Sequence, residues 1–245
     1  MRWETICFDL DNTLFSHEDA FEKAIRYCFD CILKEKNLIN KINSIALFTI
    51  FKKNCDLYWD DYEKGIISPK EYRRKRFLMT AGQFDLPFTD HDADKFHDQY
   101  YNVVDDFSEP YPYLYSLMST LAEASVKMGI ITNGTVDTQY NKIRKLSLND
   151  WISDDYVFIS EEVNVAKPNR AIFDLAKAKL GSKGKCIFIG DSWEHDVVGS
   201  IEAGWDSIFL NTRKEEPSSK HQPIEICSTL QEVAEIIYKE NNLKG

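Results

Sequence analysis

The stretch ICFDLDNTLF, residues 6–15, begins as an apolar run and is then interrupted by two carboxylates, Asp9 and Asp11. A continuous apolar run is typical of a strand that is buried on both faces of a parallel sheet. Two acids at the end of such a strand repel each other and lose hydration unless a cation or a proton compensates them. The stretch therefore has two interpretations: a strand that ends in an Asx turn at Asp11 and Asn12, or an acid pair that serves a cation.

Further apolar runs follow residue 111 and alternate with segments of helical periodicity. The runs are VKMGIIT (126–132), YVFIS (156–160), KCIFIGD (185–191), DSIFLN (206–211) and IEICS (224–228). The predicted helices are one carrying Val136, Tyr140, Ile143 and Leu146, one over 168–180, one ended by Gly204, and a last one ending at Lys239. Strands spaced by helices predict a parallel sheet with both faces covered, to which the strand at residues 5–8 also belongs.

The intervening part of the chain has the pattern of consecutive helices. The first is predicted over residues 19–39, and the second carries Leu47, Phe51, Cys55, Tyr58 and Tyr62 and ends near Gly65. The third opens at Ser68-Pro69-Lys70-Glu71 with a capping box and a proline at its first position, and the fourth runs from Thr89 to about Val104. We therefore expect an α/β core made of residues 1–15 and 111–245, with an all-helical domain of residues 16–110 inserted into it.

The composition limits the partners of the protein. Its 30 Lys and Arg against 40 Asp and Glu give a formal charge of −10, which suits neither a nucleic acid polymer nor an anionic membrane surface. The sequence has no run of 18 apolar residues and no signal segment, so we expect a cytoplasmic protein that does not bind membranes. Cys28 and Cys31 form a lone Cys-x-x-Cys at helical spacing, which favours core packing over zinc or redox chemistry. The oligomeric state is not indicated.

Polar groups follow the predicted strands at their carboxyl ends, the edge of a parallel sheet where binding sites form. They are Asp9 and Asp11, then Thr132-Asn133-Gly134, then Lys167, and then Asp191 with Asp196 five residues on. Each has an ordinary alternative: a helix N-cap for the Thr-Asn-Gly turn, a solvated loop charge for the lysine, and a strand-end turn for Asp191. Their joint occurrence at one edge predicts a single site.

The residue types suit phosphoryl transfer through a covalent intermediate. Asp9 is expected to attack phosphorus as the nucleophile, and Asp11 to act as the acid and base. We expect Mg²⁺ to be held by carboxylate oxygens of Asp9 and Asp191 and by the main-chain carbonyl of Asp11. The substrate would be a small phosphate monoester.

Other residues are expected to assist. The transferring phosphoryl oxygens would be held by Lys167, the Thr132 hydroxyl and main-chain groups of Leu10, Asn133 and Gly134. Asp196 is expected to hold a metal-bound water or Lys167 rather than the metal, and Thr13 is expected to lie with it in the layer of residues behind those that contact the substrate and the metal.

The segments DLDNT, TNG, AKP and GDSWEHD resemble, in order, the four motifs of the haloacid dehalogenase (HAD) superfamily. The resemblance covers essentially the whole chain and implies a Rossmann-like core with the helical lid of the C1 subclass. It implies the roles given above for Asp9, Asp11, Thr132, Lys167 and Asp191. WDDYEKGIIS, GIITNG and ISEEVNVAKPN are similar to the bacterial pyrimidine 5′-nucleotidase branch, which implies nucleoside 5′-monophosphates as substrates. One departure is Tyr111-Pro112-Tyr113, where many members carry Pro-Gly.

The resemblance leaves other activities open. The superfamily also holds sugar phosphatases and phosphomutases with the same core motifs. Dehalogenases typically lack the second aspartate, so Asp11 disfavours that activity. A phosphonatase needs a reactive lysine in its lid, and Lys52 and Lys53 lie off the apolar stripe of their predicted helix. A non-catalytic binding protein is disfavoured by the complete set of acids together with Lys167.

Overall fold

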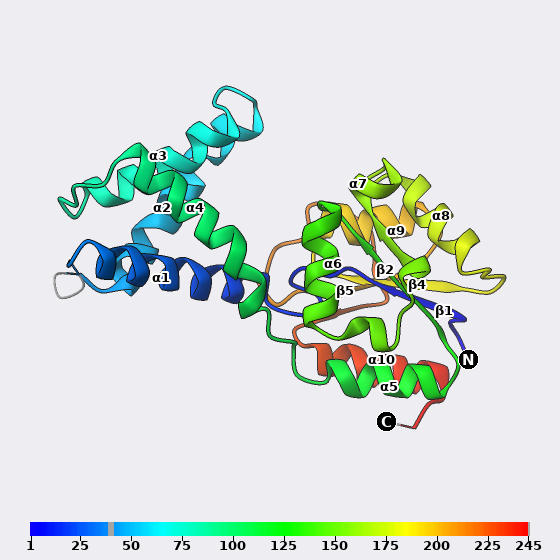
Figure 1. Cartoon of the computed structure of the whole chain (residues 1–245). Coiled ribbons are helices and arrows are strands. Elements are labelled where there is room, and N and C mark those ends of the chain that lie inside the picture. The colour runs from blue at the N-terminus through cyan, green and yellow to red at the C-terminus, as the bar shows by residue number, and fades with distance from the viewer. Residues whose placement is uncertain (39–41, 245) are drawn as a thin grey trace. The chain divides into compact units, whose positions relative to one another are not determined.

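The computed structural model describes residues 1–38 and 42–244. The chain forms two compact units, which Figure 1 shows: an α/β unit of Met1–His17 and Ser108–Gly245, and a helical unit of Glu18–Phe107. The helical unit is thus an insertion into the α/β unit, with junctions a few residues from the expected ones.

The α/β unit is built on a six-stranded sheet in the order β3-β2-β1-β4-β5-β6, and every neighbouring pair of strands is parallel. The strands are β1 (Thr5–Phe8), β2 (Lys127–Thr132), β3 (Val157–Ile159), β4 (Cys186–Gly190), β5 (Asp206–Leu210) and β6 (Glu225–Cys227). All four residues of β1 and all five of β4 are buried, which explains their continuous apolar runs. The predicted α/β fold is confirmed.

Helices cover both faces of the sheet. Figure 1 shows α5 (Leu114–Glu123) and α10 (Leu230–Asn241) on one side, and α8 (Arg170–Lys179) and α9 (Gly199–Glu202) on the other. The remaining helices of this unit are α6 (Val136–Lys145), the short α7 (Ser160–Val163), two 3-10 turns (Leu148–Asp150 and Asp154–Tyr156) and a π-helical segment (Trp193–Val198). The helix predicted from Pro168 begins two residues later, because the side chain of Asn169 caps it by accepting from the Ala171 amide.

The strand order fixes where a site can form. The chain runs outward from β1 to β2 and β3, and then returns to the other side of β1 to make β4. Such a reversal leaves a crevice at the carboxyl ends of the two central strands. Asp9 follows β1 and Asp191 follows β4, so both acids stand at this crevice.

The helical unit contains α1 (His17–Glu35), α2 (Ser44–Glu63), α3 (Pro69–Gly82), α4 (Asp90–Val103) and a 3-10 turn (Val104–Phe107). Its core includes Phe29, Phe51, Phe77 and Phe96, whose rings meet at centroid distances of 4.6–5.9 Å. The predicted capping box at Ser68 is present and opens α3. Most of the aromatic residues in this unit therefore build its own core.

Two features differ from the sequence-based expectation or add to it. The first helix, predicted to residue 39, ends at Glu35, because Asn37 adopts a left-handed conformation (φ +57°) and the Leu38 amide bonds back to Leu33; Ile39 lies outside the described residues. Tyr113, in the segment that departs from Pro-Gly, has φ +71°, a conformation that favours glycine.

Candidate active site

The loop after β1 forms a tight turn that fixes Asp9. The Asp9 amide donates to the Ile189 carbonyl of β4 (2.8 Å), and the Thr13 hydroxyl donates to the Asp9 carboxylate (3.1 Å). Asn12 has φ +58° and accepts a hydrogen bond from the His17 amide through its side chain, so a local turn is indeed present. The turn and the acid pair are therefore not alternatives, since the turn holds the acids at the crevice.

Lys167 lies between two carboxylates. Its Nζ is 2.6 Å from an oxygen of Asp9 and 2.6 Å from an oxygen of Asp196, and its side chain is only 3% exposed. The second oxygen of Asp196 accepts from the Ser192 main-chain amide. Asp196 thus holds Lys167 in place. The π-helical segment that carries Asp196 is a type of irregularity found at functional sites.

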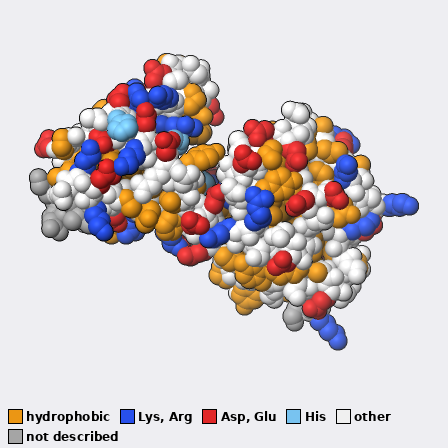
Figure 2. All heavy atoms as spheres, viewed as in Figure 1, with side chains coloured by type: hydrophobic (Ala, Val, Ile, Leu, Met, Phe, Trp, Pro, Cys, Tyr) orange, Lys and Arg blue, Asp and Glu red, His pale blue; other side chains and the backbone are white. Residues whose placement is uncertain are grey.

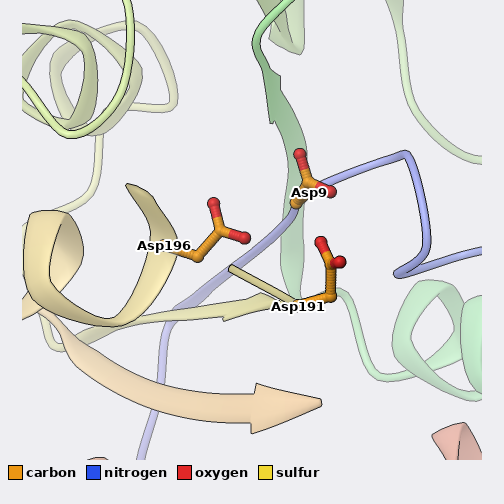
Figure 3. Close-up of side chains that lie close together, drawn as sticks. All are labelled: Asp9, Asp191 and Asp196. Carbon is orange, nitrogen blue, oxygen red and sulfur yellow. The ribbon is translucent and has the colours of Figure 1, made fainter. Parts of the chain in front are cut away.

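Figure 3 shows Asp9, Asp191 and Asp196 converging from the loop after β1, the end of β4 and the π-helical segment. One carboxylate oxygen from each of the three residues lies within 4.8 Å of the other two. Burial, together with the neighbouring acids, raises the pKa of Asp9 to about 6 and that of Asp191 to about 8, although Lys167 opposes both shifts. Negative charge at Asp9 and Asp191 is therefore incompletely compensated by protein cations.

This donor set fits a hard divalent cation. Carboxylate oxygens are the ligands that Mg²⁺ prefers, and a cation between Asp9 and Asp191 would relieve the repulsion that raises their pKa values. Asp196 is the third acid of this group, but its two carboxylate oxygens already accept hydrogen bonds, one from Lys167 and one from the Ser192 amide.

Asp11 is held by a second buried lysine. Lys142 Nζ lies 2.7 Å and 3.0 Å from the two Asp11 carboxylate oxygens, and Gln139 Nε2 donates to Asp11 at 2.9 Å. Burial raises the pKa of Asp11, but Lys142, His17 and Gln139 together outweigh it, so this pKa is lowered overall. The carboxyl of Asp11 is thus held ionised.

Gln139 and Lys142, both from α6, were missed at the sequence level. The apolar stripe predicted for this helix consists of Val136, Tyr140, Ile143 and Leu146. Val136 and Tyr140 are only half-buried, whereas Gln139 and Lys142 are 1% and 5% exposed. Gln139 stands four residues before the buried Ile143, on the same helical face. A polar residue four positions before an apolar residue of the predicted stripe is the sequence signal that could have identified Gln139.

Residues at the end of β2 and in the turn after it also form hydrogen bonds within this unit. Thr132 Oγ accepts from Gln139 Nε2 (2.6 Å), which leaves its hydroxyl proton able to donate elsewhere. The Gly134 amide, expected to hold phosphoryl oxygens, donates to Ser160 Oγ (3.0 Å) in this structure. The Leu10 side chain is fully buried, so only the main chain of this residue can serve the site.

These groups surround a pocket of about 270 Å³. Of the residues expected at the site, Asp9, Asp11, Thr132, Asn133, Lys167, Asp191 and Asp196 line it, while Leu10, Thr13 and Gly134 do not. Arg213, which the sequence reasoning did not single out, lines it as well and lies 2.9 Å from Asp191. Figure 2 shows acidic and basic side chains interspersed over the visible face.

A family model for haloacid dehalogenase-like hydrolases matches residues 3–204, and the chain belongs to this family of hydrolases. The family resemblance inferred from the four motifs is thereby confirmed. The fold agrees: the chain is similar to the crystal structure of the HAD-hydrolase YfnB from Bacillus subtilis, described as bound to magnesium, with a TM-score of 0.74, 22% identity, and coverage of 97% of this chain and 99% of that one.

Two curated relatives are enzymes that differ in substrate. The pyrimidine 5′-nucleotidase YjjG of Escherichia coli is 29% identical, over 98% of this chain and 100% of its own length. The glyceraldehyde 3-phosphate phosphatase of Methanopyrus kandleri is 30% identical, over 86% of this chain and 85% of its own length. No described helix is both long enough and apolar enough to span a membrane.

Proposed function

We propose that this hydrolase is a magnesium-dependent phosphatase that acts on small phosphate monoesters, with nucleoside 5′-monophosphates as its preferred substrates. The observation that carries the proposal is the contact of Asp9 with the buried Lys167 at 2.6 Å, beside a second acid, Asp11, in the same pocket. A nucleophilic carboxylate next to an ammonium group suits attack on a dianionic phosphoryl group.

The reaction would proceed in two steps. An Asp9 oxygen bonds to phosphorus while the bond from phosphorus to the leaving oxygen breaks, and Asp11 gives that oxygen a proton. Water then attacks the aspartyl phosphate, its proton passes to Asp11, and inorganic phosphate is released. Asp11 therefore enters the first step protonated and the second step ionised, and the attacking water returns the proton that Asp11 gave to the leaving oxygen, while the bond from phosphorus to Asp9 breaks. The hydrogen bonds that Lys142 and Gln139 donate to Asp11 favour the ionised form, which the second step requires.

The remaining pocket residues would hold the phosphoryl oxygens. Lys167 and the Thr132 hydroxyl are placed to donate to them, and the Asn133 main chain lies at the same wall. Mg²⁺, when bound, supplies positive charge that neutralises the phosphoryl oxygens and the acids. We assign its ligands to Asp9, Asp191 and the Asp11 main-chain carbonyl.

The assignment to nucleotides rests on the relationship to the Escherichia coli pyrimidine 5′-nucleotidase, which extends over both chains almost completely. In this proposal the helical unit is a lid that excludes water during the reaction. The relationship to the archaeal phosphatase supports a second candidate, a phosphorylated three-carbon or sugar substrate.

All six cysteines are free, which supports a reducing compartment such as the cytoplasm.

Two measurements test the proposal in order. The first is hydrolysis of p-nitrophenyl phosphate with Mg²⁺ and with EDTA, and we expect turnover only with the metal. The second is kcat/KM for UMP and dTMP against glyceraldehyde 3-phosphate, glucose 6-phosphate and β-glucose 1-phosphate. A tenfold preference for any of these non-nucleotide phosphates, about 1.4 kcal/mol in transition-state binding, would exclude the nucleotidase assignment.

A further inference from the structure

A buried polar bridge on α6 joins two residues of the pocket. Gln139 Nε2 contacts both Asp11 (2.9 Å) and the Thr132 hydroxyl oxygen (2.6 Å), and Gln139 Oε1 accepts from Lys142 Nζ (2.8 Å). Lys142 in turn contacts both Asp11 oxygens. The Asp11 carboxylate thus receives donors from two side chains on one helix face, at positions i and i+3.

The polar bridge buries side chains that the docking of α6 against the rest of the unit does not require. The apolar residues Ile143 and Leu146 already bury the helix against the rest of the unit, at 1% and 0% exposure. Burying a lysine beside them costs free energy unless the ion pair is well formed. Residue 134 must also be small, because a Cβ there would lie 2.9 Å from the Gln139 side chain.

We propose that Lys142 and Gln139 are positioning residues that orient the Asp11 carboxylate toward the leaving oxygen of the substrate. The inference rests on the proposed phosphatase function. An aspartate side chain has several rotamers, and only a narrow range of carboxylate positions allows proton transfer within hydrogen-bond reach. Two donors from a rigid helix, one of which also contacts Thr132, restrict Asp11 to one orientation relative to the phosphoryl pocket.

Leaving-group dependence distinguishes this role from a purely structural one. The nitrophenolate of p-nitrophenyl phosphate departs without a proton, whereas the 5′-oxygen of a nucleotide needs one. We expect Lys142→Met to lower kcat/KM for UMP at least tenfold more than kcat/KM for p-nitrophenyl phosphate, with Lys142→Arg recovering much of the loss. Gln139→Leu, which keeps the ion pair, should show the same selectivity to a smaller degree. Lys145→Met, an exposed lysine on the same helix, should behave as wild type.

The outcomes separate this inference from the proposed function. If the wild-type enzyme hydrolyses neither ester, the phosphatase assignment itself fails. If it hydrolyses both, but Lys142→Met and Gln139→Leu lower the two kcat/KM values equally or not at all, the positioning role alone is wrong. Should Lys142→Met not fold, as judged by its melting transition, Gln139→Leu decides the question by the same ratio.

Discussion

The Asn133 side chain forms two hydrogen bonds with the main chain of Lys167. Asn133 Nδ2 donates to the Lys167 carbonyl (3.0 Å), and the Lys167 amide donates to Asn133 Oδ1 (2.9 Å). The amide of Asn133 was expected to contact the substrate, yet its side chain has this additional task. The turn after β2 thus fixes the backbone from which the buried ammonium of Lys167 reaches Asp9.

Asn133→Ala should therefore reduce activity by displacing Lys167. A shift of about 1 Å in a positioned group can lower rates about 100-fold, and we expect a loss of that order in kcat/KM. Asn241→Ala is the matched control, since its side chain grips the Trp3 main chain through both the amide and the carbonyl, far from the pocket. That variant should lose thermal stability but keep kcat/KM, and equal activity losses in the two variants would contradict the proposed task of Asn133.

Gly190→Ala should impair the site from the end of β4. A Cβ at this position would fall on the carboxylate of Asp196, which holds Lys167. Overpacking of this kind costs about 1–3 kcal/mol, and here the displaced group is the partner of the ammonium. We expect a lower melting temperature and a kcat/KM reduced by about 100-fold.

Gly82→Ala provides the comparison for this variant, because nothing lies within 4 Å of a Cβ there. Gly82 is the last residue of α3, where alanine is the better helix former. We expect its stability and activity to match or exceed those of the wild type. Full activity in Gly190→Ala would show that catalysis does not depend on the present position of the Asp196 carboxylate.

The stability of the metal-free protein should fall as the pH rises. Asp9 and Asp191 have folded-state pKa values raised by burial to about 6 and about 8, above the ordinary value of 3.8. The folded state thus binds more protons than the unfolded state between about pH 4 and pH 8, so stability that is present at low pH is lost across this window. In EDTA, the melting temperature should be lower at pH 8 than at pH 5.5.

Mg²⁺ should reverse this trend, because it competes with protons for the same carboxylates. The shift in melting temperature on adding Mg²⁺ is expected to be larger at pH 8 than at pH 5.5, and Asp191→Asn should diminish it. A metal-induced shift that is independent of pH and unchanged in Asp191→Asn would show that the cation binds elsewhere.

Much of the core architecture and the pocket could be predicted from local patterns. The apolar runs predict the strands, and the rule that sites form at the carboxyl ends of parallel strands predicts that Asp9, Lys167 and Asp191 lie together. The acid pair Asp9 and Asp11 is informative because burying a charged group costs free energy unless another charge or hydrogen bonds compensate it.

What escaped prediction depends on tertiary contacts. Gln139 and Lys142 are ordinary polar helix residues in the sequence, and only the docking of α6 shows that they face Asp11. Arg213 lies outside the helices and strands, in a turn where no periodicity marks it, and only the structure shows its contact with Asp191. The early end of α1 depends on a single left-handed residue, Asn37, which helical periodicity does not reveal.

Calcium should inhibit where magnesium activates. Ca²⁺ takes more ligands at longer distances, about 2.3–2.6 Å against 2.0–2.1 Å for Mg²⁺, and so could engage both oxygens of Asp9. The nucleophile would then have no free oxygen for phosphorus. Competition of Ca²⁺ with Mg²⁺ in the p-nitrophenyl phosphate assay tests this, and equal rates with the two metals would refute the assigned ligand set.

Asp9→Asn and Asp11→Asn should both abolish phosphatase activity, for different reasons. The first variant lacks the nucleophilic oxygen and weakens the contact with Lys167. The second lacks the group that carries the proton but keeps the main-chain carbonyl assigned to the metal, so the Mg²⁺-induced shift in its melting temperature should persist. Phosphate monoesters hydrolyse so slowly in water that enzymes accelerate the reaction by up to about 10²¹-fold, and loss of either central group should lower kcat by several orders of magnitude. Wild-type turnover by Asp9→Asn would exclude the covalent mechanism, and a lost Mg²⁺ response in Asp11→Asn would place that carboxylate on the metal instead.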